Sequence, residues 1–188
     1  MWEARKIMEY CKEVTLKDGR LCCLRNGTEK DRATALETFV LTHAETDYLL
    51  TYPDENTMTV EQEAQFLKEK TESKDEIELL AEIDGKVVGT AGFERVGTQE
   101  KLKHRAVFGI GIAREYWGLG IGRALLQACI ECARAAGYAQ LELDVVTENK
   151  NAIALYKSEG FLEYGRNPKG FRSRLNGWQE LVLMRLEL

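Results

Sequence analysis

Three glycines alternate within five residues, at Gly118, Gly120 and Gly122, and apolar residues at helical spacing follow them. Residues 107–112 just upstream have the apolar character of a strand, so the glycines lie where a strand passes into a helix. Glycine lets the backbone approach a ligand closely, because it has no Cβ. The amides of such a turn, with the positive end of the helix dipole behind them, bind anions. The pattern therefore predicts a phosphate-binding turn.

Two common phosphate motifs do not fit this turn. A Walker loop continues as Gly-Lys-Ser/Thr, and no lysine follows Gly122. A dinucleotide fingerprint has the spacing GxGxxG near the start of a βαβ unit, whereas this turn reads GxGxG and comes after a hairpin at Asp84-Gly85. A third alternative depends on a second block, residues 149–161, which reads NKNAIALYKSEGF.

The two blocks together resemble the GNAT family of acyl-CoA-dependent N-acetyltransferases. The family's pyrophosphate loop, Q/R-x-x-G-x-G/A, aligns with residues 117–122. Its N-x-x-A-x-x-L-Y-x-x-x-G-F pattern matches Asn149, Ala152, Leu155, Tyr156, Gly160 and Phe161. The resemblance covers about residues 77–161. Trp117 stands where the family usually has Gln or Arg, and the Tyr-Trp-Gly sequence at residues 116–118 is similar to the ribosomal-protein-alanine N-acetyltransferase branch.

The resemblance implies acetyl-CoA as co-substrate and no metal. It implies that the last strand residues before the turn pair through their backbone with the pantetheine arm, and that an amide there stabilises the oxyanion. Arg123 would supply the positive charge that Trp117 lacks. The implied cofactor-binding residues are Ile110, Gly111, Ile112, Trp117, Gly118, Leu119, Gly120, Ile121, Gly122, Arg123, Asn149 and Tyr156.

For catalysis the resemblance implies Tyr156 as the general acid that protonates the CoA thiolate; the alternative is a core tyrosine on an amphipathic helix. Asn149 would bind the cofactor arm, cap the following helix, or do both. An ammonium acceptor must lose a proton before it attacks, so a base is required. The strand at residues 105–112 contains no carboxylate, which leaves Glu94, His104, Glu142 and Asp144 as candidates. We take Glu94 as the general base, although an exposed hairpin position explains it equally well.

The strands and helices that must position these residues are expected to form one α/β domain over residues 1–188, with residues 1–18 as an N-terminal extension. A short helix over residues 4–13 is one interpretation of that extension. We expect strands at residues 20–25, 76–83, 86–94, 105–112, 140–146, 177–186 and from 161 onward. We expect helices that begin near residues 28, 60, 121 and 151. The resemblance implies a mixed, mostly antiparallel, twisted sheet of six to seven strands flanked by about four helices and splayed between the fourth and fifth strands.

Composition narrows the class of protein. The 188 residues are 44% hydrophobic and 30% charged, with a net charge of −5, which argues against a general nucleic-acid binder. No apolar run is long enough to span a bilayer, and the N-terminus lacks the apolar core of a signal peptide, so we expect a cytoplasmic protein. Five scattered cysteines predict no disulfide framework. Cys129 and Cys132 fit the buried face of a helix better than a zinc site.

Two functions remain open at this point. The first is an enzyme that transfers acetyl from acetyl-CoA to a primary amine, either a small molecule or a peptide N-terminus, by direct attack through a tetrahedral intermediate. The second is a non-catalytic acyl-CoA-binding sensor or interaction module. A homodimer is compatible with the resemblance, and no pattern in the residues argues for it.

Overall fold

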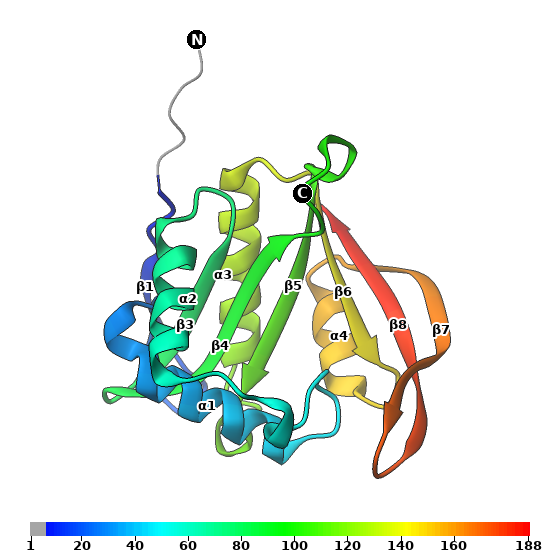
Figure 1. The fold of residues 1–188 in the computed structure, drawn as a ribbon, viewed down its shortest axis with the longest axis horizontal. Coiled ribbons are helices and arrows are strands. Elements are labelled where there is room, and N and C mark those ends of the chain that lie inside the picture. Colours follow the sequence, from blue (N-terminus) through cyan, green and yellow to red (C-terminus); the bar gives the residue numbers. More distant parts are fainter. Residues whose placement is uncertain (1–6) are drawn as a thin grey trace.

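The computed structural model describes residues 7–188. Figure 1 shows these residues as one twisted, open sheet with helices on both faces, and the strand order is β1-β2-β3-β4-β5-β6-β8-β7. The strands are β1 (Cys11–Thr15), β2 (Leu21–Asn26), β3 (Ile77–Ile83), β4 (Lys86–Arg95), β5 (Arg105–Ile112), β6 (Gln140–Val146), β7 (Leu162–Ser173) and β8 (Gly177–Glu187). The α-helices are α1 (Arg32–Glu45), α2 (Val60–Glu72), α3 (Ile121–Ala136) and α4 (Lys150–Ser158).

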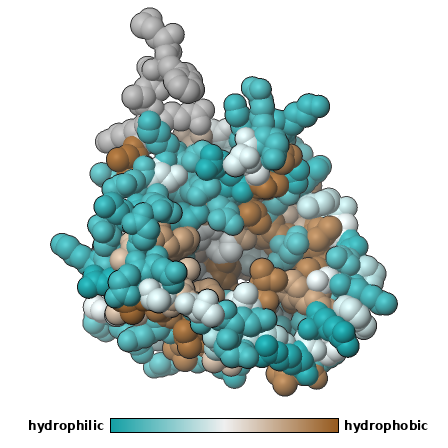
Figure 2. Space-filling view, viewed as in Figure 1, coloured by the Kyte–Doolittle hydropathy of each residue, from teal (hydrophilic) through white to brown (hydrophobic). Residues whose placement is uncertain are grey.

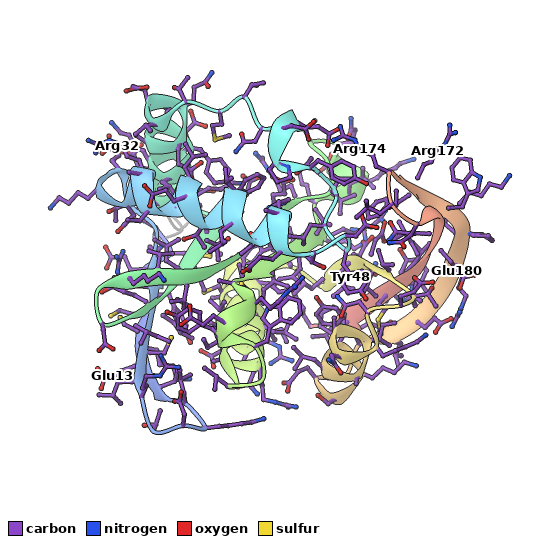
Figure 3. All side chains as sticks on the ribbon, turned by 90° about the horizontal axis from the view of Figure 1, so that it is seen from below. Glu13, Arg32, Tyr48, Arg172, Arg174 and Glu180 are labelled. Carbon is purple, nitrogen blue, oxygen red and sulfur yellow. The ribbon has the colours of Figure 1, made fainter. Side chains whose placement is uncertain are left out.

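The four helices divide between the two faces of the sheet. Seen from below, α1 and α2 lie above the strands, and α3 and α4 lie below them (Figure 3). In β5 the alternation of side chains sends Gly111 toward Thr42 of α1, whereas Ile112 contacts Gly122 at the start of α3. Odd-numbered residues of β5 therefore face α1 and α2, and even-numbered residues face α3 and α4.

The face covered by α3 carries the main hydrophobic core. Leu125, Leu126, Cys129 and Ala133 recur at helical spacing in α3 and are buried against the sheet. The helix ends at Gly137, whose φ of 86° gives the left-handed cap that stops it. The alternating residues of β3, β4 and β5 that face α3 complete this core.

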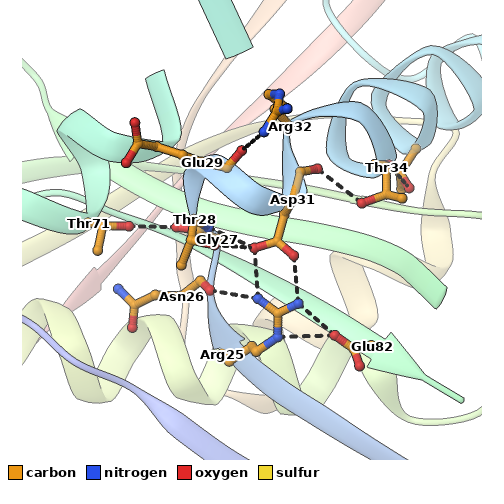
Figure 4. A network of polar contacts seen from close by, with 11 residues as sticks. Arg25, Asn26, Gly27, Thr28, Glu29, Asp31, Arg32, Thr34, Thr71 and Glu82 are labelled. Atoms are coloured by element: carbon orange, nitrogen blue, oxygen red, sulfur yellow. Dashed lines mark hydrogen bonds and ion pairs between the residues drawn. The ribbon is translucent and has the colours of Figure 1, made fainter. Parts of the chain in front are cut away.

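The face covered by α1 and α2 has a much smaller core. Its buried cluster consists of Ala35, Leu67, Leu80 and Val87. Between β2 and α1, Arg25 bridges Asp31 at 2.7 Å and Glu82 at 2.6 Å, which fixes the start of α1 over β3 (Figure 4). Because few side chains fill the rest of this face, it is left hollow.

The sheet opens between β5 and β6, the only parallel neighbours among the described strands. They pair only at Arg105–Gln140, Ala106–Leu141 and Val107–Glu142. Beyond these pairs β6 continues antiparallel to β8 as far as Val146, and β5 continues beside β4 as far as Ile112. The expected splay is thus confirmed, and it begins at Phe108.

Two expectations about the elements need correction. The sheet has eight strands, because β1 adds an outer strand to the seven expected. When β1 is left out of the count, β5 and β6 are the fourth and fifth strands along the chain, the pair between which the splay was expected. The helix considered for residues 4–13 is wrong for Cys11–Glu13, which lie in β1; residues 1–6 are outside the described part. Among residues 7–188, no helix combines the length and apolar character that a membrane span requires.

Candidate functional site

A short 3-10 helix, Arg114–Tyr116, follows the open end of β5, and the glycine turn, residues 117–122, leads from it into α3. Gly118 and Gly120 adopt φ angles of 79° and 101°, in the left-handed region that favours glycine. A Cβ at either position would meet no atom within 4 Å, so both face open space. Helix α3 begins at Ile121. Its first hydrogen bond runs from the Ala124 N–H to Gly120 O, so the helix hydrogen bonds start with the amide of Ala124. The backbone amides of Ile121 and its neighbours are therefore available to an anion.

Two side chains of the turn have other partners. The Trp117 indole N–H donates to Ile112 O at 2.7 Å, which ties the turn to the end of β5. The Arg123 guanidinium forms an ion pair with Glu159 and a 3.1 Å hydrogen bond to Ser158, so its charge is shared with the end of α4. Gly122 packs against Ile112 and Leu155, each 3.4 Å from where its Cβ would be. In this geometry the positive end of the turn consists of backbone amides.

Helix α4 brings the second sequence block to the same opening. Asn149 caps α4, because its side-chain oxygen accepts from the Ala152 N–H at 3.3 Å. Tyr156 is only 6% exposed, and its ring lies 6.3 Å from Phe108 and 5.8 Å from Phe161. Burial raises the pKa of the Tyr156 hydroxyl, which keeps the phenol protonated. Tyr156 thus lies beside the first β5 residue that has no partner in β6.

A cavity of about 490 Å³ lies on the opposite face, between the sheet and helices α1 and α2. Figure 2 shows this face hollowed near its middle, with hydrophobic side chains around the hollow. The floor comes from β3, β4 and β5, and includes Gly109 and Gly111 at the open end of β5. Apolar walls come from α1, α2 and the connection between them, among them Leu36, Phe39, Leu50, Met58 and Phe66.

The cavity also contains an acidic group of side chains. Glu63 from α2 is 8% exposed, and burial raises its pKa. Glu78 from β3 is half-buried, and desolvation raises its pKa to about 7 against the opposing effect of the Thr90 hydroxyl. Glu94 at the end of β4 has a side chain 62% exposed and lies 3.3 Å from Lys70 of α2, which is also 2.8 Å from Glu76.

The remaining expected bases lie elsewhere. His104 is exposed before β5, and its carbonyl accepts from the backbone of Ala139 and Gln140. Glu142 forms an ion pair with Arg105, which is the main reason that its pKa is lowered. The Asp144 side chain is exposed on β6. None of these three lines the cavity.

Sequence reasoning found Glu94 but missed Glu63 and Glu78 at the acidic end of the cavity, and it missed His43. The His43 ring stacks on Phe39 at 3.8 Å, and burial lowers its pKa. The one feature of the sequence that could have pointed to Glu78 is Gly92, which lies opposite it in the hairpin. The Glu78 side chain occupies the space that a Cβ at Gly92 would need. Within residues 7–188, no group of three or more His, Cys, Asp or Glu side chains is arranged for a metal ion.

Comparison with known proteins agrees with this geometry. The chain is 38% identical over 88 residues to the N-alpha-acetyltransferase RimI of Mycobacterium tuberculosis, a match that covers 47% of this chain and about half, 53%, of that relative. The solved ribosomal-protein-alanine N-acetyltransferase from Brucella melitensis superposes with a TM-score of 0.78 at 28% identity, over 88% of this chain and 99% of its own.

A second solved structure, the yncA protein from Salmonella typhimurium with its cofactor acetyl-CoA, superposes with a TM-score of 0.78. It is 22% identical, covers 89% of this chain and 94% of its own, and so shows a common fold. The sequence model of the acetyltransferase (GNAT) family matches residues 39–161, which run from α1 through the cavity floor and the glycine turn to the end of the second block. The chain therefore belongs to the GNAT family of acetyltransferases.

Proposed function

We propose that this protein transfers an acetyl group from acetyl-CoA to a primary amine. The observation that carries the proposal is the open end of β5, residues 108–112, which has no neighbour in β6 and is followed, after residues 113–116, by the glycine turn. This edge lies between two different environments, with Tyr156 on one face of the sheet and the acidic cavity on the other.

The residues present fit acetyl-CoA as the bound group. Gly118 and Gly120 leave space for a pyrophosphate against the backbone, and the amides from Gly120 to Arg123 supply the donors. The backbone of Ile110, Gly111 and Ile112 would pair with the pantetheine arm, with the Ile112 carbonyl already bonded to Trp117. Asn149 can contact the same arm from its capping position.

Chemistry would then take place at the β5 edge. An amide there would donate to the thioester carbonyl and stabilise the oxyanion that forms when the amine attacks. Tyr156, protonated because it is buried, would donate to the departing sulfur. A thiolate is already a fair leaving group, so this donation increases the rate without being indispensable.

The acceptor would enter through the cavity. A volume of about 490 Å³ suits a small amine or the first residue or two of a peptide, and its carboxylates favour a cation. The names of the relatives point to protein N-termini as one acceptor class. All five cysteines are free thiols, as reducing compartments maintain, which supports a cytoplasmic enzyme.

The test is CoA release measured with a panel of amines: an alanine-terminated peptide, a free amino acid, a polyamine and 2-phenylethylamine. We expect at least one acceptor to give saturable turnover. Tight acetyl-CoA binding without turnover on any amine would favour the sensor alternative instead, and failure to bind acetyl-CoA would eliminate both functions.

Tyr156→Phe tests the proposed acid. Its ring contacts with Phe108 and Phe161 are kept, so acetyl-CoA affinity should stay the same while kcat falls roughly tenfold to a hundredfold. Tyr138→Phe is the matched control, because it removes a buried hydroxyl that donates to Asp75 O at 2.9 Å, outside the site. Equal kcat for Tyr156→Phe and the parent across pH would remove Tyr156 from the mechanism.

A further inference from the structure

The floor of the cavity contains one row of residues that crosses three strands. Glu78 of β3 is paired with Gly92 of β4, and Gly92 is paired with Gly109 of β5. Residues directly opposite in a sheet point to the same face, so all three lie on the face of α1 and α2. The row therefore begins at a carboxyl group and ends at the open edge of β5.

The two glycines keep this row clear of side chains. A Cβ at Gly92 would collide with the Glu78 carboxylate, which shows that this carboxylate reaches over β4 into the space that glycine leaves. A Cβ at Gly109 would meet nothing within 4 Å. Neighbouring strands lie about 4.8 Å apart, so roughly one strand spacing separates the carboxylate from the backbone of β5. That space accommodates one amine nitrogen in hydrogen-bond contact with Glu78.

We propose that Glu78, rather than Glu94, is the catalytic base that takes a proton from the acceptor's ammonium group at the β5 edge. This inference rests on the proposed function, since it names the base at the same site. Glu94 points its more exposed carboxylate at Lys70, whereas Glu78 lies in the row that leads to Gly109. Glu63, buried on α2 at the same end of the cavity, is the second carboxylate that the cation meets.

The protons balance as follows. The ammonium gives one proton to the Glu78 carboxylate, and the neutral nitrogen forms a bond to the thioester carbon. The carbon–sulfur bond then breaks, and its electron pair leaves with the sulfur. The sulfur takes up one proton from Tyr156, which regains one as the attacking nitrogen loses its second. Glu78 releases its proton to water, so each turnover yields the amide, CoA thiol and one proton.

Several groups set the charge of Glu78. Glu63 and Lys70 face it from α2 and Glu94 from β4, and His43 of α1 lines the same cavity. Cys129 of α3 lies on the other face of the sheet and interacts with Glu78 only electrostatically. Burial places its pKa at about 7, so near neutral pH it is divided between the form that accepts a proton and the form that releases one. A carboxyl group with this pKa can take a proton from the ammonium and release it to water within each turnover.

The experiment compares Glu78→Gln and Glu94→Gln with the parent, using the panel amine that the parent turns over fastest. We expect Glu78→Gln to lower kcat at least about 100-fold with unchanged acetyl-CoA affinity. It should also remove the rise in kcat near pH 7, so that only the acceptor's own titration remains, near about 8 for a peptide N-terminus and near about 10 for an alkylamine. Glu69→Gln, on the exposed side of α2, is the control and should match the parent.

A larger loss in Glu94→Gln than in Glu78→Gln, or an unchanged pH profile in Glu78→Gln, would overturn the assignment while leaving the proposed function intact. If the parent itself turns over no amine, the proposed function fails and this inference falls with it. Gly109→Val is a second variant that leaves Glu78 untouched and places its side chain in open space. It should lower kcat/KM for the amine while acetyl-CoA still binds, and an unchanged kcat/KM would contradict the row as the acceptor's path.

Discussion

At the scale of single residues, Glu78 links activity to stability. Its pKa is about 7 in the folded protein, above the ordinary value of 4.5, because folding removes the carboxyl from water. The folded state therefore binds more protons than the unfolded chain between about pH 4.5 and pH 7. The free energy of unfolding must fall as the pH rises through this window.

Glu78→Gln should remove this dependence, because an amide does not ionise. We expect the variant to be more stable than the parent at about pH 8, by on the order of 1–3 kcal/mol, and the gain to disappear near about pH 4.5. Urea unfolding of both proteins across this range measures the difference. A constant difference at every pH would mean that Glu78 ionises as freely as an exposed carboxyl.

The sequence and the structure differ in how well they identify single residues. Tyr156 and Asn149 could be proposed from the sequence, since the pattern that suggests them lies in one continuous segment. Glu78 could not, because it becomes part of the site only through cross-strand pairing with Gly92 and Gly109. Glu94 was accessible to sequence reasoning as a hairpin carboxylate, but its contact with Lys70, 24 positions earlier in the chain, depends on how α2 packs.

At the scale of elements, the glycine turn depends on backbone conformation. Gly120→Ala forces a Cβ onto a residue with φ of 101°, which should cost about 1–2 kcal/mol of stability. Gly177→Ala, with φ of 70° and equally open surroundings, imposes similar strain in the β7–β8 hairpin. We expect thermal unfolding to detect both changes.

Acetyl-CoA titration calorimetry should separate these two variants, because only the Gly120 backbone belongs to the proposed anion site. Gly120→Ala should lower the affinity at least about tenfold and Gly177→Ala should not. Equal affinities would mean that the cofactor does not approach the backbone at Gly120.

Most elements were predictable because their patterns are local: amphipathic α3, the Asp84-Gly85 hairpin and the glycine that ends α3. Strand β1 was not, because its five residues are mostly exposed and form a strand only through pairing with β2. The cavity was also invisible from sequence, since it exists between helices α1 and α2 and three strands that are separated along the chain.

At the scale of the whole molecule, the connection between α1 and α2 is fastened to the far end of the sheet. Asp47 accepts from Ser173 at 2.5 Å and from Asn176 at 2.7 Å, and its carbonyl accepts from Gln179 at 3.1 Å. Figure 3 shows Arg174 beside this connection, where it pairs with Asp54 at 2.8 Å. The same connection supplies part of the cavity wall.

Asp47→Ala should loosen this wall. The variant deprives the buried Ser173 hydroxyl of its carboxylate acceptor, which should cost roughly 1–3 kcal/mol in urea unfolding, and it should raise KM for the amine more than KM for acetyl-CoA. Asp54→Ala, which removes only an exposed ion pair, is the control and should change neither quantity measurably. Equal rises in both KM values would show that the connection does not act on the acceptor side alone.

The parting of β5 from β6 at Phe108 has a consequence for inhibitor design. If the two reactants approach from opposite faces of the sheet, a conjugate that joins CoA covalently to an amine must place one half on each face. Its linker then has to pass between β5 and β6, which are hydrogen-bonded at one end only. Such a compound should gain the affinity of both halves and yet associate slowly, with a rate limited by how often the open end widens. Stopped-flow binding of the conjugate beside that of CoA alone would measure this passage directly.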